Sequence, residues 1–405
     1  MATNDKTARD AVILSAARIP QGKLLGALAP FTAVQLGQIA VRAAVERSGV
    51  DMNRIDEVII GQVLAAGAGQ AVPRQISLGA GLPPHVGGVA VNKVCGSSLK
   101  AAMLAAGLIR LGDGDLYVAG GVESMTNAPF LHLEGRAGHK YGHVEIKDAI
   151  MWDGLWDHVE GWIMGEAAEL IAREFEITRE ELDEFACRSH QLAHAATVEG
   201  RFKEEIVPVE IPGRKGQATI FDQDESIRPD TSMETLAKLR PAFIPDGIVT
   251  AGNAPGLNDG AAAVVLASRA YAEQHGHQPL ARIVAYGQAA VEPKWLFAAP
   301  IKGIQNALLR AGWTMDDVDL VELNEAFAAQ VLADLKGLER DGYPLPLEKL
   351  NVNGGAIAIG HPIGASGARV LVTLLHALKQ HGLKRGLASL CLGGGEAVAM
   401  AIEIE

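Results

Sequence analysis

The sequence predicts an α/β protein built from two similar halves. Short apolar runs alternate with segments rich in helix-forming residues, and many of the 46 glycines stand in clusters between them. This pattern is typical of the tight turns of α/β proteins. An internal repeat indicates the two halves, because residues 39–49 align with 302–312 and residues 55–60 align with 318–323. Both alignments have the same offset, 312 − 49 = 263 and 318 − 55 = 263.

The elements of the first half follow in chain order. The apolar run 11–17 predicts a first strand, since it is too short to span a bilayer. The repeated segment predicts a helix that stops at Gly49 and then a strand over 55–60. A further strand ends just before Cys95, and a strong helix-forming run begins at about residue 97.

An insertion separates the two halves. Its helical runs are 166–175 and 180–198, and Thr178 with Glu181 predicts a capping box at the start of the second run. The later half repeats the first, with a helix that opens near Ser366. We therefore expect a first half formed by residues 1–123 and 251–275, an inserted loop domain over 124–250, and a second half over 276–405.

Composition excludes several classes of function. The chain has 405 residues, 48% of them hydrophobic, and a formal net charge of −12. Such an acidic protein is not expected to bind nucleic acid or an anionic membrane. Three cysteines cannot form a paired disulfide framework, and residues 1–6 contain no apolar signal region. We therefore expect a reducing compartment, the cytoplasm.

Two cysteines, Cys95 and Cys391, carry the strongest chemical signal. Each follows a short apolar run and precedes small residues, which predicts a strand ending in a tight, exposed turn. A helix starts directly after Cys95, and its positive end is expected to lower the pKa of the thiol. The alternative is a small buried core residue. Cys187 lies within an amphipathic helix, away from any glycine turn, and is expected to be structural.

Two segments of the second half have a catalytic character. His361 stands between Gly360 and Pro362 in a glycine-rich loop, and a histidine in such a loop suits a general base. Asn324 follows the repeated strand, and the first half has no amide at the matching place. A helix N-cap is the alternative interpretation of Asn324.

At these residues the chain resembles the thiolase family over nearly its whole length, and most closely the short-chain acetyl-CoA acetyltransferases. The motifs that carry the resemblance occur in the family's order. They are Asn92-Lys93-Val94-Cys95-Gly96-Ser97, Thr250-Ala251-Gly252-Asn253-Ala254, Leu257-Asn258-Asp259-Gly260-Ala261-Ala262-Ala263, Asn324-Glu325-Ala326-Phe327, Gly360-His361-Pro362-Ile363-Gly364-Ala365-Ser366-Gly367 and Cys391-Leu392-Gly393-Gly394-Gly395.

The resemblance implies a thiolase-like layered α/β core and a reversible condensation of two acetyl-CoA to acetoacetyl-CoA and CoA. Cys95 would be the acylated nucleophile, His361 its base, and Cys391 the acid and base for the second substrate. Asn324 would hold a water that forms one oxyanion hole with His361. The N–H groups of Cys95 and Gly393 would form the other. CoA is then substrate and product, and neither a cofactor nor a metal site is expected.

The CoA nucleotide is anionic, so a local basic patch is expected on this acidic chain. The insertion offers Arg228, Lys238 and Arg240, although the last two also suit a solvated basic face. The resemblance places Arg228 near the adenine. The remaining residues it places along the pantetheine arm and acyl pocket are Ala251, Gly252, Met164, Ala326, Phe327 and Pro255.

The chain departs from the family pattern near the substrate. Pro255 replaces the usual serine, and Ile163 stands where short-chain members often have histidine. Met164 matches the short-chain pattern, so acetyl-CoA and acetoacetyl-CoA are the expected substrates. The nearby tryptophans either pack the insertion against its neighbour or line an acyl channel for longer or branched chains. They are Trp152, Trp156 and Trp162.

Three alternatives remain open at this point. One is a 3-ketoacyl-CoA thiolase for longer or branched chains, and another is a β-ketoacyl synthase, which would require a second histidine where Cys391 stands. The third is a non-catalytic CoA-binding scaffold. Binding alone would not require Cys95, His361, Asn324 and Cys391 to occur together, so their presence argues against this alternative. The loop from Asn127 to Asp148 has no obvious core of its own, and the resemblance assigns such a loop to tetramer assembly. We therefore expect a homo-oligomer, a homotetramer formed as a dimer of dimers.

Overall fold

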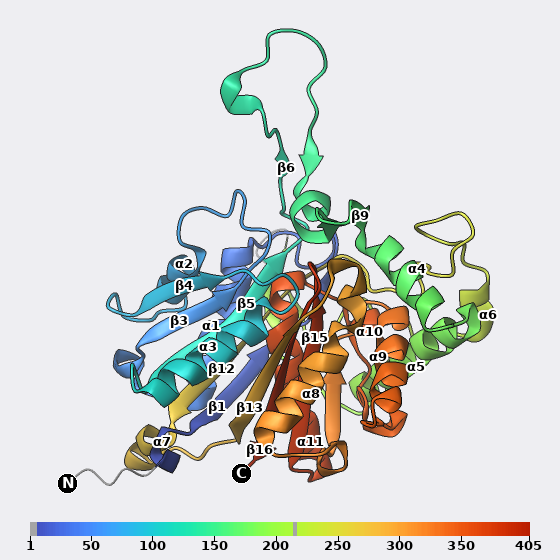
Figure 1. Cartoon of the computed structure of the whole chain (residues 1–405). Coiled ribbons are helices and arrows are strands. Elements are labelled where there is room, and N and C mark those ends of the chain that lie inside the picture. The colour runs from blue at the N-terminus through green and yellow to red at the C-terminus, as the bar shows by residue number, and fades with distance from the viewer. Residues whose placement is uncertain (1–5, 214–216) are drawn as a thin grey trace.

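A computed structural model describes residues 6–213 and 217–405 of the chain. Residues 1–5, on which the expectation of no signal region partly rests, lie outside the described residues. Within the described part, one large mixed sheet of ten strands runs through the molecule (Figure 1). Its order is β14 (Leu320–Leu323), β15 (Arg385–Leu392), β16 (Glu396–Ile404), β13 (Ala281–Ala290), β1 (Ala11–Arg18), β12 (Asn258–Ser268), β5 (Leu116–Ser124), β3 (Glu57–Gly61) and β4 (Gly87–Val91), with β2 (Gly22–Lys23) beside β12.

The two halves of the sheet meet at a short antiparallel contact between β1 and β13. Only Val12 with Arg282 and Ile13 with Ala281 are paired there. Elsewhere the strands pair over much longer registers, for example along β12 and β5. The short junction lets the halves face each other across a helical layer, so the layered α/β core built from two βαβ-rich halves is confirmed.

Two helices form that central layer. The helices α3 (Ser97–Leu111) and α11 (Ser366–His381) pack against each other and against strands of both halves. The outer layers are α1 (Ala33–Ser48) with α2 (Val72–Gly79) on the first half and α8 (Ala299–Ala311) on the second. The stretch Val94–Leu111 has the length and apolar character of a membrane span. Here it contains a core helix, because most side chains of α3 are buried.

The internal repeat appears as matched elements. Helices α1 and α8 both end at a left-handed glycine, with φ 65° at Gly49 and 69° at Gly312. A side chain is disfavoured at such an angle, which explains the glycine stop in both copies. Strands β3 and β14 follow, then the pairs α3 with α11 and β5 with β15. The predicted repeat is therefore a repeat of structure.

The insertion contains helices and small two-stranded sheets. The predicted helical runs are α4 (Met164–Glu174) and α5 (Arg179–Val198), and Thr178 caps α5 with Glu181 as expected. The other elements are β6 (Phe130–Leu131), β7 (Lys147–Asp148), β8 (Trp156–Asp157), β9 (Trp162–Ile163), β10 (Val209–Pro212), β11 (Ala218–Phe221) and α6 (Met233–Ala237). The division into parts at residues 123, 250 and 275 stays our prediction.

The remaining elements are short segments and connecting helices. They are α7 (Arg269–His275), α9 (Ala328–Arg340), α10 (Ala356–Ile359), the π-helix η4 (Ile150–Leu155) and the 3₁₀ turns η1 (Lys6–Arg9), η2 (Met52–Arg54), η3 (Gly135–Ala137), η6 (Pro293–Ala298), η7 (Met315–Asp317), η8 (Leu347–Lys349) and η9 (Ile363–Ala365). Figure 1 shows the β6–β7 segment projecting from the body of the molecule as a long arm.

Candidate active site

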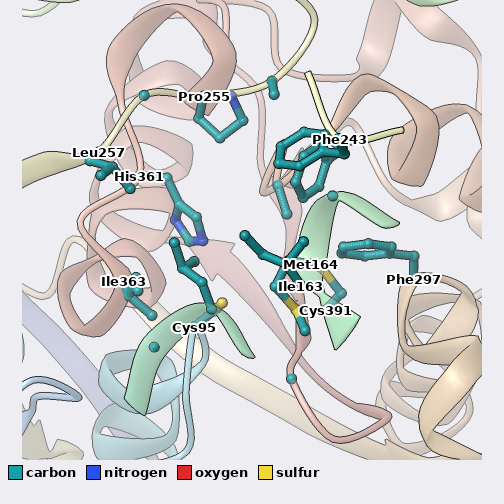
Figure 2. Close-up of a pocket in the computed structure, with 18 of the residues that line it drawn as sticks. Cys95, Ile163, Met164, Phe243, Pro255, Leu257, Phe297, His361, Ile363 and Cys391 are labelled. Atoms are coloured by element: carbon teal, nitrogen blue, oxygen red, sulfur yellow. The ribbon is translucent and has the colours of Figure 1, made fainter. Parts of the chain in front are cut away.

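A cavity of about 300 Å³ lies where the ends of β4 and β15 meet the insertion. Figure 2 shows Cys95, His361 and Cys391 turned into it, with apolar side chains around them. Its other lining residues are Val94, Met125, Gly154, Leu155, Ile163, Met164, Gly165, Ala242, Phe243, Thr250, Ala251, Ala254, Pro255, Gly256, Leu257, Leu296, Phe297, Ala326, Phe327, Ile363 and Gly393. A mostly apolar wall with a few reactive groups is typical of a small-molecule site.

Cys95 sits on a tight turn between β4 and α3. The turn is held by Ser97, whose hydroxyl accepts from the N–H of Lys93 at 2.9 Å and donates to the carbonyl of Val94 at 2.6 Å. Val94 has φ 46°, a left-handed angle that a β-branched residue rarely adopts. Such strain is kept where the surroundings fix it, often at functional sites. The predicted turn is therefore present, with Cys95 at its tip.

The environment of Cys95 corrects one expectation. The residue is partly open to the cavity, but burial of the sulfur raises the pKa of the thiol to about 12. The backbone N–H groups of Cys95 and Gly393 act in the opposite direction, and the carboxylate of Glu123 adds to the increase. The predicted lowering by the helix end was wrong because desolvation is the larger effect. Cys95 therefore needs a base to become nucleophilic.

Cys391 lies near the end of β15, directly beside the Cys95 turn. A Cβ atom on Gly96 would come within 2.2 Å of the Leu392 side chain, so the two segments touch. The turn after Leu392 uses left-handed glycines, Gly394 at φ 82° and Gly395 at φ 87°. Cys391 is buried rather than exposed as expected, with 1% of its surface accessible. Burial, together with the charge of Cys95, raises the pKa of its thiol well above the usual value.

His361 is fixed from both its backbone and its ring. Its N–H donates to the side-chain oxygen of Asn258 at 3.0 Å. The preceding residue, Gly360, has a backbone φ of 119° and lies against the same Asn258 amide, which leaves no room for a side chain. The ring atom Nδ1 lies 2.6 Å from the hydroxyl of Ser366. Burial, helped by the charge of Arg369, lowers the pKa of His361 to about 3. The imidazole is therefore neutral near pH 7, which is the form a general base requires.

Asn324 lies behind His361 rather than on the cavity wall. Its side chain is fully buried, and Nδ2 stands 3.5 Å from His361 Nδ1, too far for a strong hydrogen bond. Its N–H pairs with the carbonyl of Ser389 on β15. The helix that follows, α9, has Phe327 at its N-cap position, so Asn324 is not the N-cap of that helix. The structure thus brings Cys95, His361, Cys391 and Gly393 to one cavity, with Asn324 immediately behind.

The predicted CoA residues divide into two groups. Those that line the cavity are Ala251, Met164, Ala326, Phe327 and Pro255. The others do not line it. Arg228 is exposed at the mouth, where its guanidinium donates to the carbonyl of Ala251 at 3.4 Å. Gly252 packs against α6, because a Cβ atom there would meet Leu236 and Leu239 at 2.5 Å. Lys238 pairs with Glu234 at 2.6 Å, with both side chains largely exposed.

Sequence reasoning missed several residues that shape the site. Phe243 packs on Gly165, where a Cβ atom would come within 2.2 Å of its ring, and it forms one wall with Phe297 and Phe327. Glu123 holds the loops around the cavity by accepting from the N–H groups of Val63, Leu64 and Gly364. These three bonds are 2.9 to 3.0 Å long. Burial raises the pKa of Glu123 to about 7.

The three tryptophans of the insertion are not among the described residues that line the cavity. Trp162 lies against the core of the second half, and Trp152 stacks edge-on to His158 with Lys147 over its ring. The packing alternative is therefore the one the structure supports. Among the described residues, no group of three or more His, Cys, Asp or Glu is arranged to hold a metal ion.

Comparison with known families divides the chain into two matches. Residues 11–270 match the family "Thiolase, N-terminal domain", and residues 277–404 match "Thiolase, C-terminal domain". Together they cover nearly the whole chain.

Comparison with individual proteins gives the same result at full length. The acetyl-CoA acetyltransferase of Cupriavidus necator is 51% identical over 97% of this chain and 99% of its own length. That of Pseudomonas aeruginosa is 49% identical over the same shares. The crystal structure of the Bacillus anthracis acetyl-CoA acetyltransferase is 45% identical with a TM-score of 0.94, covering 98% of this chain and 99% of its own. The structure of the acetyl-CoA acetyltransferase from Syntrophomonas wolfei is 42% identical in sequence with a TM-score of 0.96, and it also covers 98% of this chain and 99% of its own.

Proposed function

The chain belongs to the thiolase family, and we propose that it is an acetyl-CoA acetyltransferase that condenses two acetyl-CoA through an acyl group on Cys95. One observation supports this proposal most directly. A single cavity presents two thiols and a neutral imidazole, and two backbone N–H groups stand close enough to stabilise negative charge on the Cys95 sulfur. Acyl transfer from a thioester needs a nucleophile, a base and an oxyanion hole.

The first half-reaction acylates Cys95. Its sulfur attacks the thioester carbonyl while His361 takes the thiol proton, and the carbonyl oxygen becomes an oxyanion held by the N–H groups of Cys95 and Gly393. Removing one such donor typically lowers kcat by about 10²- to 10³-fold. When the tetrahedral intermediate collapses, the CoA sulfur leaves and must receive a proton. Because burial keeps Cys391 protonated, its thiol supplies that proton and becomes a thiolate.

The second half-reaction uses the thiolate left on Cys391. It removes a proton from the α-carbon of the second acetyl-CoA, and the enolate oxygen is stabilised by His361 and a water held by Asn324. The enolate attacks the acetyl group on Cys95 and forms the new carbon–carbon bond. The Cys95 sulfur then leaves, taking back the proton that His361 has held. All protons return to their starting positions, so the site can turn over in either direction.

The substrate proposal rests on the walls of the cavity. Acetyl-CoA and acetoacetyl-CoA suit a pocket narrowed by Met164 and Phe243. We place the pantetheine arm along Ala251 and Pro255 and the nucleotide near Arg228, which lies at the mouth. Lys238 would add only long-range attraction, because its charge is already paired with Glu234.

A kinetic assay tests the activity and the main alternatives. The protein is incubated with acetoacetyl-CoA and CoA, and formation of acetyl-CoA is followed. We expect thiolysis with CoA thioesters and no turnover of the matching acyl carrier protein thioesters. Turnover of carrier thioesters alone would favour a β-ketoacyl synthase, and binding of CoA without turnover would favour a scaffold.

We also propose a homotetramer assembled through the arm. Its exposed apolar side chains, which nothing in the described chain covers, are Phe130, Leu133, Tyr141, Val144 and Ile146. Exposed apolar surface of this kind often marks an interface. Light scattering at micromolar concentration should give the mass of four chains, and a monomer would contradict the proposal.

We also propose a cytoplasmic location, since a catalytic thiol must stay reduced.

A further inference from the structure

One buried arginine, Arg369, directs a hydrogen bond at the candidate active site. It lies on the first turn of α11, three residues after Ser366, so both side chains share one face of the helix. Ser366 contacts His361, and Arg369 contacts Asn324. The start of α11 therefore reaches the two groups that are proposed to form one oxyanion hole.

The contacts of Arg369 are few for a fully buried charge. Nη2 donates to Asn324 Oδ1 and Nη1 donates to Glu322 Oε2, each at 3.3 Å. Glu322 and Asn324 are two residues apart, and side chains at that spacing share one face of a strand. Nε of Arg369 has no hydrogen-bond partner among the described residues.

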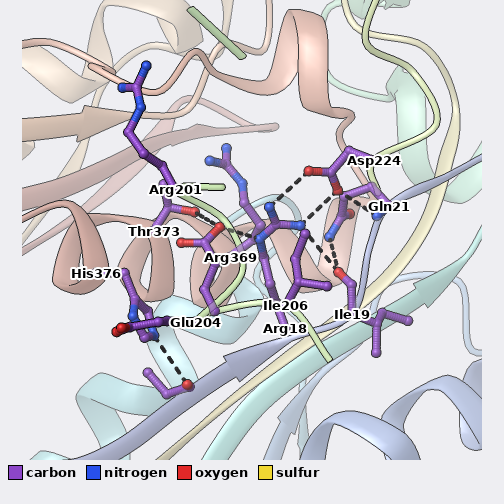
Figure 3. A network of polar contacts seen from close by, with 12 residues as sticks. Arg18, Ile19, Gln21, Arg201, Glu204, Ile206, Asp224, Arg369, Thr373 and His376 are labelled. Atoms are coloured by element: carbon purple, nitrogen blue, oxygen red, sulfur yellow. Dashed lines mark hydrogen bonds and ion pairs between the residues drawn. The ribbon is translucent and has the colours of Figure 1, made fainter. Parts of the chain in front are cut away.

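A second buried arginine nearby, Arg18, provides a comparison, because both of its side-chain partners are carboxylates. Arg18 is bound to Glu205 at 2.6 Å and to both oxygens of Asp224 at 2.7 and 2.9 Å. Figure 3 shows Arg369 beside this cluster, and Thr373 on the same helix donates to Glu205. Arg18 thus satisfies its charge with two carboxylates. Arg369 instead gives one of its two bonds to a neutral amide.

The chemistry of the two groups fixes the orientation of that amide. A guanidinium has only donors, so it can accept nothing from the NH2 group of Asn324. The amide oxygen must therefore face Arg369, and the NH2 group must face the other way, where His361 Nδ1 lies at 3.5 Å. His361 Nδ1 gives its hydrogen to Ser366, so the NH2 group makes no hydrogen bond to the ring and can donate to a water beside it. Without Arg369, the amide could turn its oxygen to that side and could no longer donate to the water.

We propose that Arg369 is a positioning residue, which holds the Asn324 amide with its NH2 group turned toward His361 so that it can donate to the oxyanion-hole water. This inference rests on the proposed function, because it assigns the hole to the thiolase reaction. It predicts that Arg369 acts on turnover only through Asn324.

A double-mutant cycle tests this dependence. Arg369→Lys keeps the positive charge beside Glu322 but cannot supply two fixed parallel donors. We expect it to lower kcat by about tenfold, with KM for acetyl-CoA changed by less than about threefold, in the otherwise unchanged protein. In an Asn324→Ala background, the same replacement should lower kcat by less than about twofold. An equal loss in both backgrounds would overturn the proposal.

Arg18→Lys is the matched control. It makes the same replacement at a buried arginine of the neighbouring cluster, which does not contact Asn324. Its effect on kcat should be the same in the parent and in the Asn324→Ala background, because a general loss of packing is independent of the amide. Coupling to Asn324 as strong as that of Arg369→Lys would show that any change in this cluster mimics positioning, and would overturn the assignment.

A variant that leaves Arg369 in place covers the case in which Arg369→Lys does not fold. Asn324→Asp has nearly the same shape and still accepts from Arg369, but it has no NH2 group. We expect a loss in kcat of about 100-fold, as for Asn324→Ala. Parental kcat in Asn324→Asp would mean that an oxygen faces His361, and would overturn the orientation.

The proposed function is checked in the same samples. Acylation of Cys95 in the parent protein is read by mass after incubation with acetyl-CoA. If the parent is not acylated, the proposed function fails. If the parent is acylated and condenses acetyl-CoA while the two replacements are independent, only the role of Arg369 fails.

Discussion

The Nδ1 atom of His361 lies 2.6 Å from the hydroxyl oxygen of Ser366, and that hydroxyl donates its hydrogen to the carbonyl of Pro362 at 2.9 Å. A hydroxyl has one hydrogen, so Ser366 accepts from His361 and the proton of the neutral ring is on Nδ1. The other ring nitrogen, Nε2, is then free to accept a proton. This bond prepares His361 as a base before any substrate binds.

The first prediction concerns the pH dependence of acylation. Because the pKa of His361 is lowered to about 3, the base form is complete above about pH 4 and is lost only as the pH falls through 3. The rate constant for acylation of Cys95, measured by rapid quench from pH 5 to 8, should therefore show no inflection near 6.5 that is due to His361. Glu123, with a pKa raised to about 7, titrates in the same range, so the profile is also measured in Glu123→Gln. A sigmoidal rise centred near 6.5 that persists in Glu123→Gln would mean that His361 titrates as an ordinary histidine.

The second prediction separates the two cysteines. Cys391→Ala removes the base of the second half-reaction and the group that protonates the departing CoA sulfur, but it leaves Cys95 and His361 in place. A thiolate can leave unprotonated and take its proton from water, so acylation should be slowed rather than stopped. One acetyl group should accumulate on Cys95, while acetoacetyl-CoA formation falls by at least about 10²-fold. The bound acetyl group is weighed, and product is measured in the same reaction. Condensation at the parental rate would show that another group moves the α-proton.

The third prediction concerns substrate size. Met164 and Phe243 line the cavity, and we propose that they limit the length of the acyl chain, so the parent should cleave acetoacetyl-CoA faster than 3-oxohexanoyl-CoA. Met164→Ala removes three heavy atoms from the wall and should raise the relative rate for the longer substrate by about 10-fold. The ratio of kcat/KM for the two substrates is the measurement. A parent that prefers 3-oxohexanoyl-CoA would favour the longer-chain thiolase instead.

The fourth prediction is a pH-dependent stability. His190 is buried on α5, its Nδ1 accepts from the N–H of Arg228 at 3.2 Å, and burial lowers its pKa to about 4. A lowered pKa stabilises the folded state above pH 6.5, and this stability is lost as the pH falls to 4. The loss is on the order of 3 kcal/mol. The His190→Asn variant should not show this pH-dependent loss, and its side-chain oxygen can still accept the hydrogen bond from the N–H of Arg228.

Urea unfolding at pH 7.5 and pH 4.5 measures this effect. The parent should lose more unfolding free energy between the two values than His190→Asn does. His143→Asn, a replacement of an exposed histidine on the arm, is the control and should behave like the parent. Equal losses in all three proteins would place the pH sensitivity elsewhere.

Local signals predicted the repeat and the reactive turns, because their causes are local. Gly49 and Gly312 end equivalent helices through a left-handed backbone, and Gly96 next to Cys95 allows the close approach of Leu392. The pKa of Cys95 could not be predicted in this way. It depends on desolvation by distant segments, whereas the sequence displays only the adjacent helix. Phe243 and Arg369 were missed for the same reason, since only the fold brings them to the site.

The central claim is that Cys95 carries the acyl group, and intact mass measurement followed by peptide mapping after incubation with acetyl-CoA tests it most directly. The parent and Cys187→Ser, which removes the cysteine buried in α5, should each gain one acetyl group on the peptide that contains Cys95. Cys95→Ser should gain none and should lose turnover, because a serine hydroxyl is far harder to ionise than a thiol. An unmodified Cys95 in a protein that still forms acetoacetyl-CoA would contradict the claim.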